Sequence, residues 1–244
     1  MTDAVADIAA EPVSCNLCGG KTFGDMGRRK NVRCLACGSL ERTRAMMLVL
    51  QKLKPTLDGC RILHFAPEKA LSHYFLDRVG PSNYVAADIA PENFPFCDVQ
   101  KFDLCRDLSG LEPESYDLIV HSHVLEHVPC NYTMVLHGLH KALKADGIQL
   151  CCIPFSPGFY QEDCSPLSAE ERTRRFGQDD HYRRFGQKDV QSTVGMVFKV
   201  PEEYDLEVDF SSGLLDRYNI PASERKGFSG STILALKKGD LKLS

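Results

Sequence analysis

The 244-residue sequence predicts an α/β protein, with a mostly parallel sheet covered by helices on both faces. Between residues 39 and 155, short apolar runs of strand type alternate with longer segments whose apolar residues recur at helical spacing, as in successive strand–helix–strand units. The C-terminal part differs, because the strand-like runs 203–210 and 231–238 are joined by a loop without a helix. This predicts that the sheet ends in an antiparallel hairpin.

The expected elements follow in chain order. Ser39 is a suitable N-cap for a helix that runs to about Leu53. Pro67 suits the first turn of a second helix, which ends at Gly80. The remaining elements are a helix over 132–144, ended by Asp-Gly, and strands over 62–66, 83–89, 99–104, 116–124 and 148–155.

Composition limits the classes of protein to consider. Hydrophobic residues make up 43% of the chain, enough for one core and a small accessory module. There is no run of about 18 apolar residues and no secretion signal at the start, so we expect a soluble, cytoplasmic protein with no membrane partner. In that compartment the 11 cysteines should bind metal or fill the core rather than form disulfides. The formal net charge of -4 gives no overall attraction to nucleic acid.

Two CxxC pairs, CNLC at 15–18 and CLAC at 34–37, are typical of a four-cysteine zinc site. We therefore expect a metal-binding zinc ribbon over 15–38, after a flexible N-terminus (1–14) and before the main domain (39–244). Four thiolates close the tetrahedral shell and leave no position for substrate, which favours a structural zinc. The alternative is four reduced, buried cysteines. The predicted ligands are Cys15, Cys18, Cys34 and Cys37.

The ribbon region is basic. From Cys15 to Arg44, seven Lys or Arg stand against two acidic residues, a formal charge of +5. Three interpretations stay open: the ribbon shapes the entrance of a substrate site, it docks phosphates, or it is a solvated face on a structural clip. The side chains concerned are Arg28, Arg29, Lys30 and Arg33.

In sheets of this type, ligands bind beyond the carboxyl ends of the strands, near the switch in strand order. This rule directs attention to His64–Glu68, Asp88, Asp103 and His121–His127. Asp88 lies 20 residues after Glu68 at the end of the second strand, where a carboxylate can accept both hydroxyls of an adenosine ribose. The alternative is an ordinary carboxylate in a turn.

Taken together, five segments resemble the class I S-adenosylmethionine-dependent methyltransferases of the type 11 branch. They are ILHFAPE (62–68), YVAADI (84–89), FDL (102–104), SYDLIVHSHVLEHV (115–128) and LHKALKADG (139–147). The resemblance covers roughly residues 61–147. It implies a Rossmann-like, doubly wound sheet of seven strands with a C-terminal antiparallel hairpin, and S-adenosyl-L-methionine as the cofactor.

The resemblance also implies the residues that bind the cofactor. Most family members have an acidic residue followed by a glycine-rich loop, where this chain has His64, Ala66, Pro67 and Glu68. The cofactor carries no pyrophosphate, so an Ala-Pro turn can serve, and Glu68 can replace the missing acid by pairing with the cofactor's ammonium group. The predicted cofactor-binding residues are His64, Phe65, Ala66, Glu68, Asp88, Ile89, Asp103, Leu104 and His121.

Methyl transfer to a hydroxyl or ammonium acceptor requires an aligned acceptor and removal of a proton. Histidine suits proton transfer near neutral pH, and the predicted catalytic residues are His123, His127 and His181. For His127 the alternative is a packed residue at a helix start. His181 belongs to a segment, 156–187, that we expect to form a lid over the acceptor. The arginines of this segment either bind an anionic substrate group or form salt bridges on a solvated turn; they are Arg174, Arg175, Arg183 and Arg184.

The leading functional hypothesis is O- or N-methylation of a small-molecule or carbohydrate acceptor, with the ribbon shaping the substrate side. A second hypothesis is a zinc-ribbon methyltransferase acting on rRNA or tRNA. Against it stand the negative net charge, the few aromatic residues near the basic cluster and the absence of an NPPY-type motif after the fourth strand. A third hypothesis is a non-catalytic, cofactor-binding scaffold, because the first loop lacks glycine. No oligomeric state is predicted.

Overall fold

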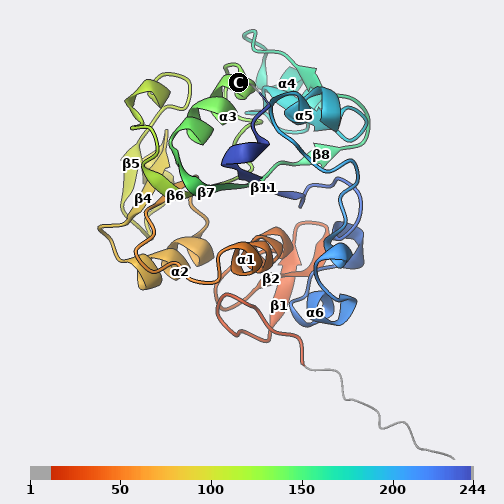
Figure 1. Ribbon diagram of the computed structural model, residues 1–244. Coiled ribbons are helices and arrows are strands. Elements are labelled where there is room, and N and C mark those ends of the chain that lie inside the picture. Colours follow the sequence, from red (N-terminus) through yellow and green to blue (C-terminus); the bar gives the residue numbers. More distant parts are fainter. Residues whose placement is uncertain (1–11, 243–244) are drawn as a thin grey trace, which may run out of the picture.

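The computed structural model describes residues 12–242 and has a six-stranded sheet at its centre (Figure 1). The strand order is β11-β7-β6-β3-β4-β5, and only β11 pairs antiparallel, with β7. The direction of winding therefore reverses at β3. The predicted α/β fold with a mostly parallel sheet is confirmed. The strands are β3 (Ile62–Phe65), β4 (Tyr84–Asp88), β5 (Val99–Lys101), β6 (Tyr116–Ser122), β7 (Leu143–Cys152) and β11 (Ile233–Lys237).

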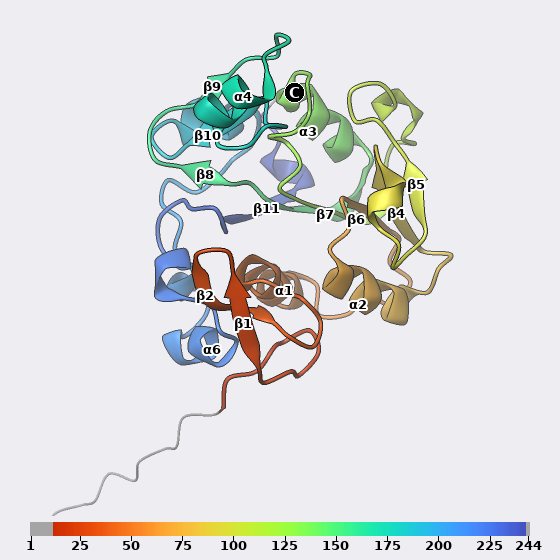
Figure 2. The same cartoon turned by 180° about the vertical axis from the view of Figure 1, so that it is seen from behind.

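Helices cover both faces of this sheet (Figures 1 and 2). α1 (Glu41–Leu53) and α2 (Lys69–Val79) lie on one face, and α3 (Tyr132–Lys141) and α5 (Val194–Val197) on the other. Each face has its own apolar core, because the strands are buried on both sides. The first core includes Met47, Leu50, Ile62, Phe75 and Leu118, and the second includes Phe65, Ile119, Leu136, Leu139 and Phe198.

Shorter elements complete the structure. A three-stranded sheet in the order β8-β10-β9 is formed by the segment between β7 and β11. Its strands and the two remaining α-helices are β8 (Phe155–Ser156), β9 (Gln161–Glu162), α4 (Ala169–Phe176), β10 (Arg183–Gly186) and α6 (Ser212–Arg217). Six 3-10 turns lie at Pro91–Asn93, Leu108–Gly110, Val190–Ser192, Leu206–Val208, Ala222–Glu224 and Lys238–Asp240.

The prediction of seven strands with a C-terminal hairpin is wrong in one element. Residues 203–210 form no strand beside β11; instead Leu206–Val208 is a 3-10 turn. The Asp205 side chain accepts the backbone N–H of Glu207 at 2.8 Å, and Leu206 donates its N–H to Arg225 at 2.8 Å. These backbone N–H groups are thus already hydrogen-bonded to Asp205 and Arg225 and cannot pair with β11. The apolar side chains that looked like a strand face, Tyr204, Leu206 and Phe210, are buried under the sheet.

Two predicted helix boundaries also differ. The N-cap of α1 is Leu40, not Ser39, and the Thr43 hydroxyl accepts the Leu40 N–H at 3.2 Å. α3 ends at Lys141, three residues early, because Leu143 already pairs with Tyr116 of β6. A side chain at Gly147 would meet the Tyr116 carbonyl oxygen at 3.0 Å, so glycine is needed here inside the strand.

The N-terminal ribbon is a two-stranded antiparallel sheet, β1 (Phe23–Met26) and β2 (Arg29–Cys34), packed below α1 beside α6 (Figure 2). The fully buried Arg44 of α1 fastens it to the main domain. The Arg44 guanidinium donates to the carbonyls of Ser39, Val32, Tyr218 and Asn219 at 2.8–3.0 Å. One arginine therefore joins the ribbon to the segment after α6.

Most of the N-terminus expected to be flexible (1–14) lies outside the described residues. Among residues 12–242, none of the helices combines the length and apolar character that a membrane crossing requires.

Candidate active site

A cavity of about 360 Å³ opens where β3, β4 and β6 end, at the point where the strand order reverses. The loops after these strands and after β5 form its walls. Six of the predicted cofactor-binding residues and two of the predicted catalytic residues line it: Phe65, Ala66, Asp88, Ile89, Asp103, Leu104, His123 and His127. Phe94, Phe102 and Asp180 line it as well.

The loop after β3 turns sharply although it contains no glycine. Ala66 has a φ of 47°, in the left-handed region that glycine usually occupies. Its N–H donates to the Ala87 carbonyl at 3.1 Å, which holds the turn against the end of β4. An alanine in this conformation costs about 1–2 kcal/mol. The small methyl side chain keeps the backbone close to the cavity.

Two carboxylates mark one side of the cavity. Asp88 Oδ1 accepts the Ala90 N–H at 2.8 Å, and Oδ2 has no hydrogen-bond partner among residues 12–242. Partial burial raises the pKa of Asp88 above its usual value, and the hydrogen bond from Ala90 opposes that effect. Asp103 Oδ1 accepts the Cys105 N–H at 2.8 Å. Each carboxylate is thus oriented by its own backbone. Asp88 Oδ2 is left for a ligand, whereas Asp103 Oδ2 lies 3.5 Å from Nε of the exposed Arg106.

Three predicted cofactor-binding residues lie outside this cavity. His64 is fully buried against Tyr84, whose hydroxyl is 3.0 Å from Nδ1, and burial together with nearby His121 lowers the pKa of His64 to about 3. His121 is also buried, with Nε2 3.1 Å from the Gln149 amide nitrogen. Glu68 makes an ion pair with Arg42 at 2.9 Å and lines a separate cavity of about 580 Å³ beside the ribbon. Its pairing with a cofactor ammonium group stays a prediction.

The three predicted catalytic histidines gather around Glu126. His123 has a φ of 54°; its Nε2 is 2.9 Å from the Gly230 carbonyl and its Nδ1 is 3.4 Å from Glu126 Oε1. The ring of His127 packs edge-on against that of His181, with centroids 4.6 Å apart. Burial lowers the pKa of His123 to about 3 and raises that of Glu126 to about 8. The sequence places Glu126 with His123 and His127 within reach of an acceptor, but we did not predict it as a catalytic residue.

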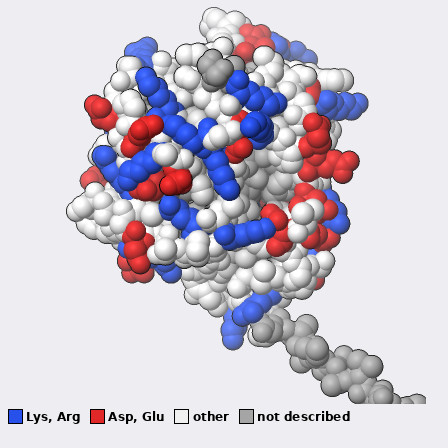
Figure 3. Space-filling view, in the orientation of Figure 1, with Lys and Arg blue, Asp and Glu red and all other residues white. Residues whose placement is uncertain are grey.

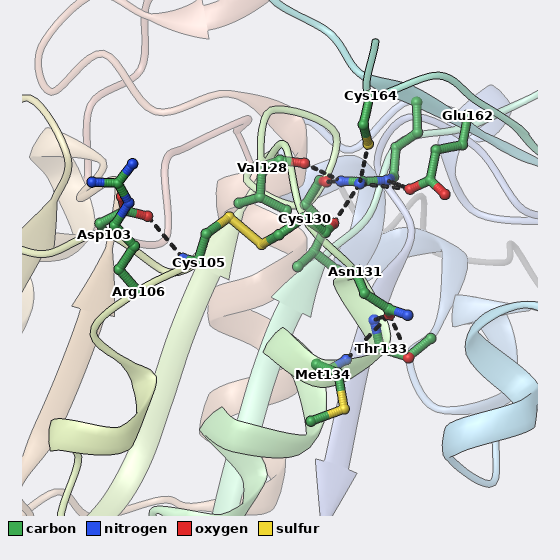
Figure 4. Close-up of a disulfide and its surroundings, with 12 residues drawn as sticks. Asp103, Cys105, Arg106, Val128, Cys130, Asn131, Thr133, Met134, Glu162 and Cys164 are labelled. Carbon is green, nitrogen blue, oxygen red and sulfur yellow. Dashed lines mark hydrogen bonds and ion pairs between the residues drawn. A yellow bond between two sulfur atoms is a disulfide. The ribbon is translucent and has the colours of Figure 1, made fainter.

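Arg183 holds the loop that carries these residues. Its side chain is fully buried, and its guanidinium donates to the carbonyls of Leu125, Val128 and Cys130, the last two at 2.7 Å. Glu162 pairs with the same guanidinium at 2.6 Å. Figure 4 shows Val128, Cys130 and Glu162 converging from three sides. Arg183 is therefore a positioning residue, which the sequence did not distinguish from its neighbours.

The other arginines of the segment form ion pairs with acidic neighbours. Arg174 pairs with Glu171 and Arg175 with Asp163. Arg184 has no such partner and lines an open groove. These pairs agree with the solvated, salt-bridged alternative more than with a ready-made anion site.

A disulfide joins Cys105, after β5, to Cys130, before α3 (Figure 4). We expected no disulfides, but the two loops meet at the cavity rim with Cα atoms 5.8 Å apart, within bonding range. Cys105 also lines the cavity. The covalent bond links the wall that carries Asp103 to the wall that carries His127.

The four ribbon cysteines form a compact sulfur cluster. Cys15 and Cys37 Sγ are 3.7 Å apart, Cys18 and Cys34 Sγ are 3.6 Å apart, and all four lie within 4.8 Å of one another. A tetrahedral ion with Zn–S bonds of about 2.3 Å requires sulfurs about 3.8 Å apart. Gly19 and Gly38 turn the chain behind each pair with φ of 73° and 80°. The geometry fits four-sulfur coordination.

The basic side chains of the ribbon are partly neutralised. Arg29 pairs with Glu41 and Lys30 with Asp25, and Arg44 is buried. Figure 3 shows one face of the molecule, on which basic and acidic side chains are interspersed rather than separated.

The sequence of the cavity region has recognisable relatives. A model of the family described as methyltransferase domain matches residues 65–151, which run from the last residue of β3 into β7 and include most of the cavity lining. This segment is thus similar to the methyltransferase domain family. The matched segment carries Asp88, Asp103, His123 and His127, whereas Asp180 and His181 lie beyond it.

Solved structures of methyltransferases also align with the chain. The CurJ carbon methyltransferase is 25% identical over 49% of this chain (TM-score 0.33), and the trans-methyltransferase CalH in complex with SAH is 22% identical over 48% (TM-score 0.33). This chain covers only about a third of each, 33% and 36%. An S-adenosylmethionine dependent methyltransferase from Mesorhizobium loti is 15% identical, covering 79% of this chain and 96% of that one (TM-score 0.49). No curated protein matches the chain significantly.

Proposed function

We propose that this protein is an S-adenosyl-L-methionine-dependent methyltransferase that methylates an oxygen or nitrogen of a small-molecule or carbohydrate acceptor. The observation that supports this proposal best is the cavity at the strand-order switch, which has oriented carboxylates on one side and imidazoles on another. Its volume of about 360 Å³ is typical of small-molecule sites.

The residues present fit the cofactor. Asp88 has a free oxygen at the end of β4 for the ribose hydroxyls, and Asp103 and Leu104 flank the position expected for adenine. Phe65 and Ile89 supply apolar walls. When bound, the cofactor supplies an electrophilic methyl group on a sulfonium. The protein then has to hold the acceptor in line and receive its proton.

His123 and His127 are placed for that second task, because both line the cavity. His127 Nδ1 is 3.0 Å from Asp180 Oδ2, so it carries the ring N–H and leaves Nε2 to accept a proton. The ring of His181 supports His127 edge-on. The catalytic roles of His123 and His181 stay predictions.

For the ribbon we propose a structural zinc bound by its four cysteines. A short ribbon buries little surface, so the ion supplies folding energy that packing cannot. The ribbon then borders the cavity of about 580 Å³ beside Glu68 and Arg42, on the substrate side.

Cofactor binding tests the proposal directly. We expect calorimetry with S-adenosylmethionine to detect binding, and Asp88→Asn to weaken it about 10- to 100-fold, because a charged hydrogen bond contributes about 1.5–3 kcal/mol. The exposed Asp58, whose side chain makes no hydrogen bond or ion pair with the described residues, provides a matched control in Asp58→Asn. Equal binding by Asp88→Asn and the wild type would overturn the placement of the cofactor.

Incubation with methyl-labelled cofactor identifies the acceptor. The label should enter a fraction of cell metabolites or nucleotide sugars. Transfer to total RNA would establish the RNA methyltransferase instead, and cofactor binding with no labelled fraction would favour a scaffold.

A further inference from the structure

A second group of metal-ligating side chains lies at the wall of the cavity, apart from the ribbon. Glu126, His127 and His181 each offer one ligand atom, and the three atoms lie within 4.8 Å of one another. Glu126 and His127 follow β6, whereas His181 precedes β10. The fold thus brings together residues more than 50 positions apart in the chain.

Both imidazoles are held as metal-binding histidines usually are. His127 Nδ1 faces Asp180 Oδ2 at 3.0 Å, and His181 Nδ1 faces the Phe176 carbonyl at 3.3 Å. Each Nδ1 therefore carries the proton, and each Nε2 keeps its lone pair. In metal sites a carboxylate or backbone carbonyl orients the imidazole in this way. Nε2 of His181 is buried and has no hydrogen-bond partner in the part of the chain that the structure describes.

Glu126 supplies the strongest reason to expect a bound cation at this site. Only 1% of the residue is exposed, and neither carboxyl oxygen makes a hydrogen bond among residues 12–242. His123 Nδ1 lies 3.4 Å from Oε1, but Nε2 of the same ring donates to the Gly230 carbonyl, so Nδ1 of the neutral imidazole has no proton to donate to Glu126. Arg183 acts on Glu126 only through its charge, because its guanidinium hydrogen-bonds to three carbonyls and Glu162. A buried carboxyl group without a hydrogen bond is costly, and a bound cation would remove that cost.

We propose that Glu126, His127 and His181 bind a divalent first-row transition-metal ion. Two imidazoles and one carboxylate suit zinc, iron or manganese and leave coordination positions open. Of the three ligands His127 lines the cavity, as does its partner Asp180, so an ion bound here would lie at the edge of the space for the acceptor. The role of the ion rests on the proposed function: an acceptor hydroxyl bound to it loses its proton more readily, to water, and His127 then acts as a ligand instead of a base.

Counting metal ions tests the site without any methyl transfer. The purified full-length chain is loaded with Zn²⁺, freed of loose ions and measured by elemental analysis. Two zinc ions per chain are expected, one in the ribbon and one here. Glu126→Gln and His181→Gln should each bind one. The half-buried His137, which makes no hydrogen bond or ion pair among residues 12–242, gives the control His137→Gln with two.

A titration of the ribbon-loaded chain with Zn²⁺ supplies the second measurement. Asp180→Asn, which only alters the group behind His127, should weaken binding about 10- to 100-fold, whereas loss of a direct ligand should weaken it more. One zinc per wild-type chain, or a second zinc retained by Glu126→Gln and His181→Gln, would refute the site. Failure of S-adenosylmethionine to bind would instead refute the proposed function and leave the zinc count unchanged.

Discussion

Replacement of Arg183 by methionine tests whether one buried guanidinium organises the active-site loop. The arginine binds three carbonyls of residues 125–130 and the carboxylate of Glu162, and it is fully buried. Methionine keeps much of the apolar stem but removes every donor. The loop that carries Glu126 and His127 would then lose its main anchor to β10.

The size of the expected loss of stability follows from the groups that lose Arg183 as a hydrogen-bond partner. Each buried carbonyl that loses its partner costs about 1–3 kcal/mol. The Glu162 side chain is 35% exposed, so water replaces much of that ion pair and its loss adds little. Allowing for water that reaches part of the loop, we expect the free energy of unfolding to fall by about 3–5 kcal/mol, a large share of a typical total.

Urea unfolding of Arg183→Met and wild type measures this difference. Arg184→Met is the control, because its neighbouring guanidinium has no hydrogen-bond or ion-pair partner among residues 12–242; it should change stability by less than about 1 kcal/mol. Cofactor affinity should also fall in Arg183→Met, since Val124, His127 and Val128 line the cavity. If both variants are equally stable, Arg183 does not organise the loop.

Two further predictions concern metal and pH. Chelation of the ribbon metal, or Cys34→Ser, should make residues 15–38 sensitive to limited proteolysis. The α/β domain should stay folded, because the main sheet has its own apolar cores. Equal protection of residues 15–38 with and without chelator would contradict a structural ion. His64 is buried and neutral, with its pKa lowered from 6.5 to about 3, so its stabilising contribution is present above pH 6.5 and is lost as the pH falls toward 3. Between pH 7.5 and pH 5 this loss is about 2 kcal/mol, and His64→Phe should show a pH dependence of unfolding smaller by that amount. Identical pH profiles would show that His64 does not titrate in this way.

The sequence by itself determined the elements whose signals are local. Helical and strand periodicity located all six central strands and the helices α1 to α3, because burial on one or both faces imposes a period on neighbouring residues. The CxxC spacing located the sulfur cluster, and the ends of predicted strands identified Asp88 and Asp103 as cavity residues. These positions depend on residues close together in the chain.

The tertiary structure alone decided what depends on distant segments. The expected strand at 203–210 turned into a 3-10 turn because Leu206 pairs with Arg225 instead of an edge strand. Arg183 and Arg184 are neighbours in one motif, yet only the first is buried against a loop more than 50 residues away. The Cys105–Cys130 bond and the meeting of Glu126 with His181 arise in the same way. Burial and long-range contacts are properties of the packed chain, so no local sequence pattern predicts them.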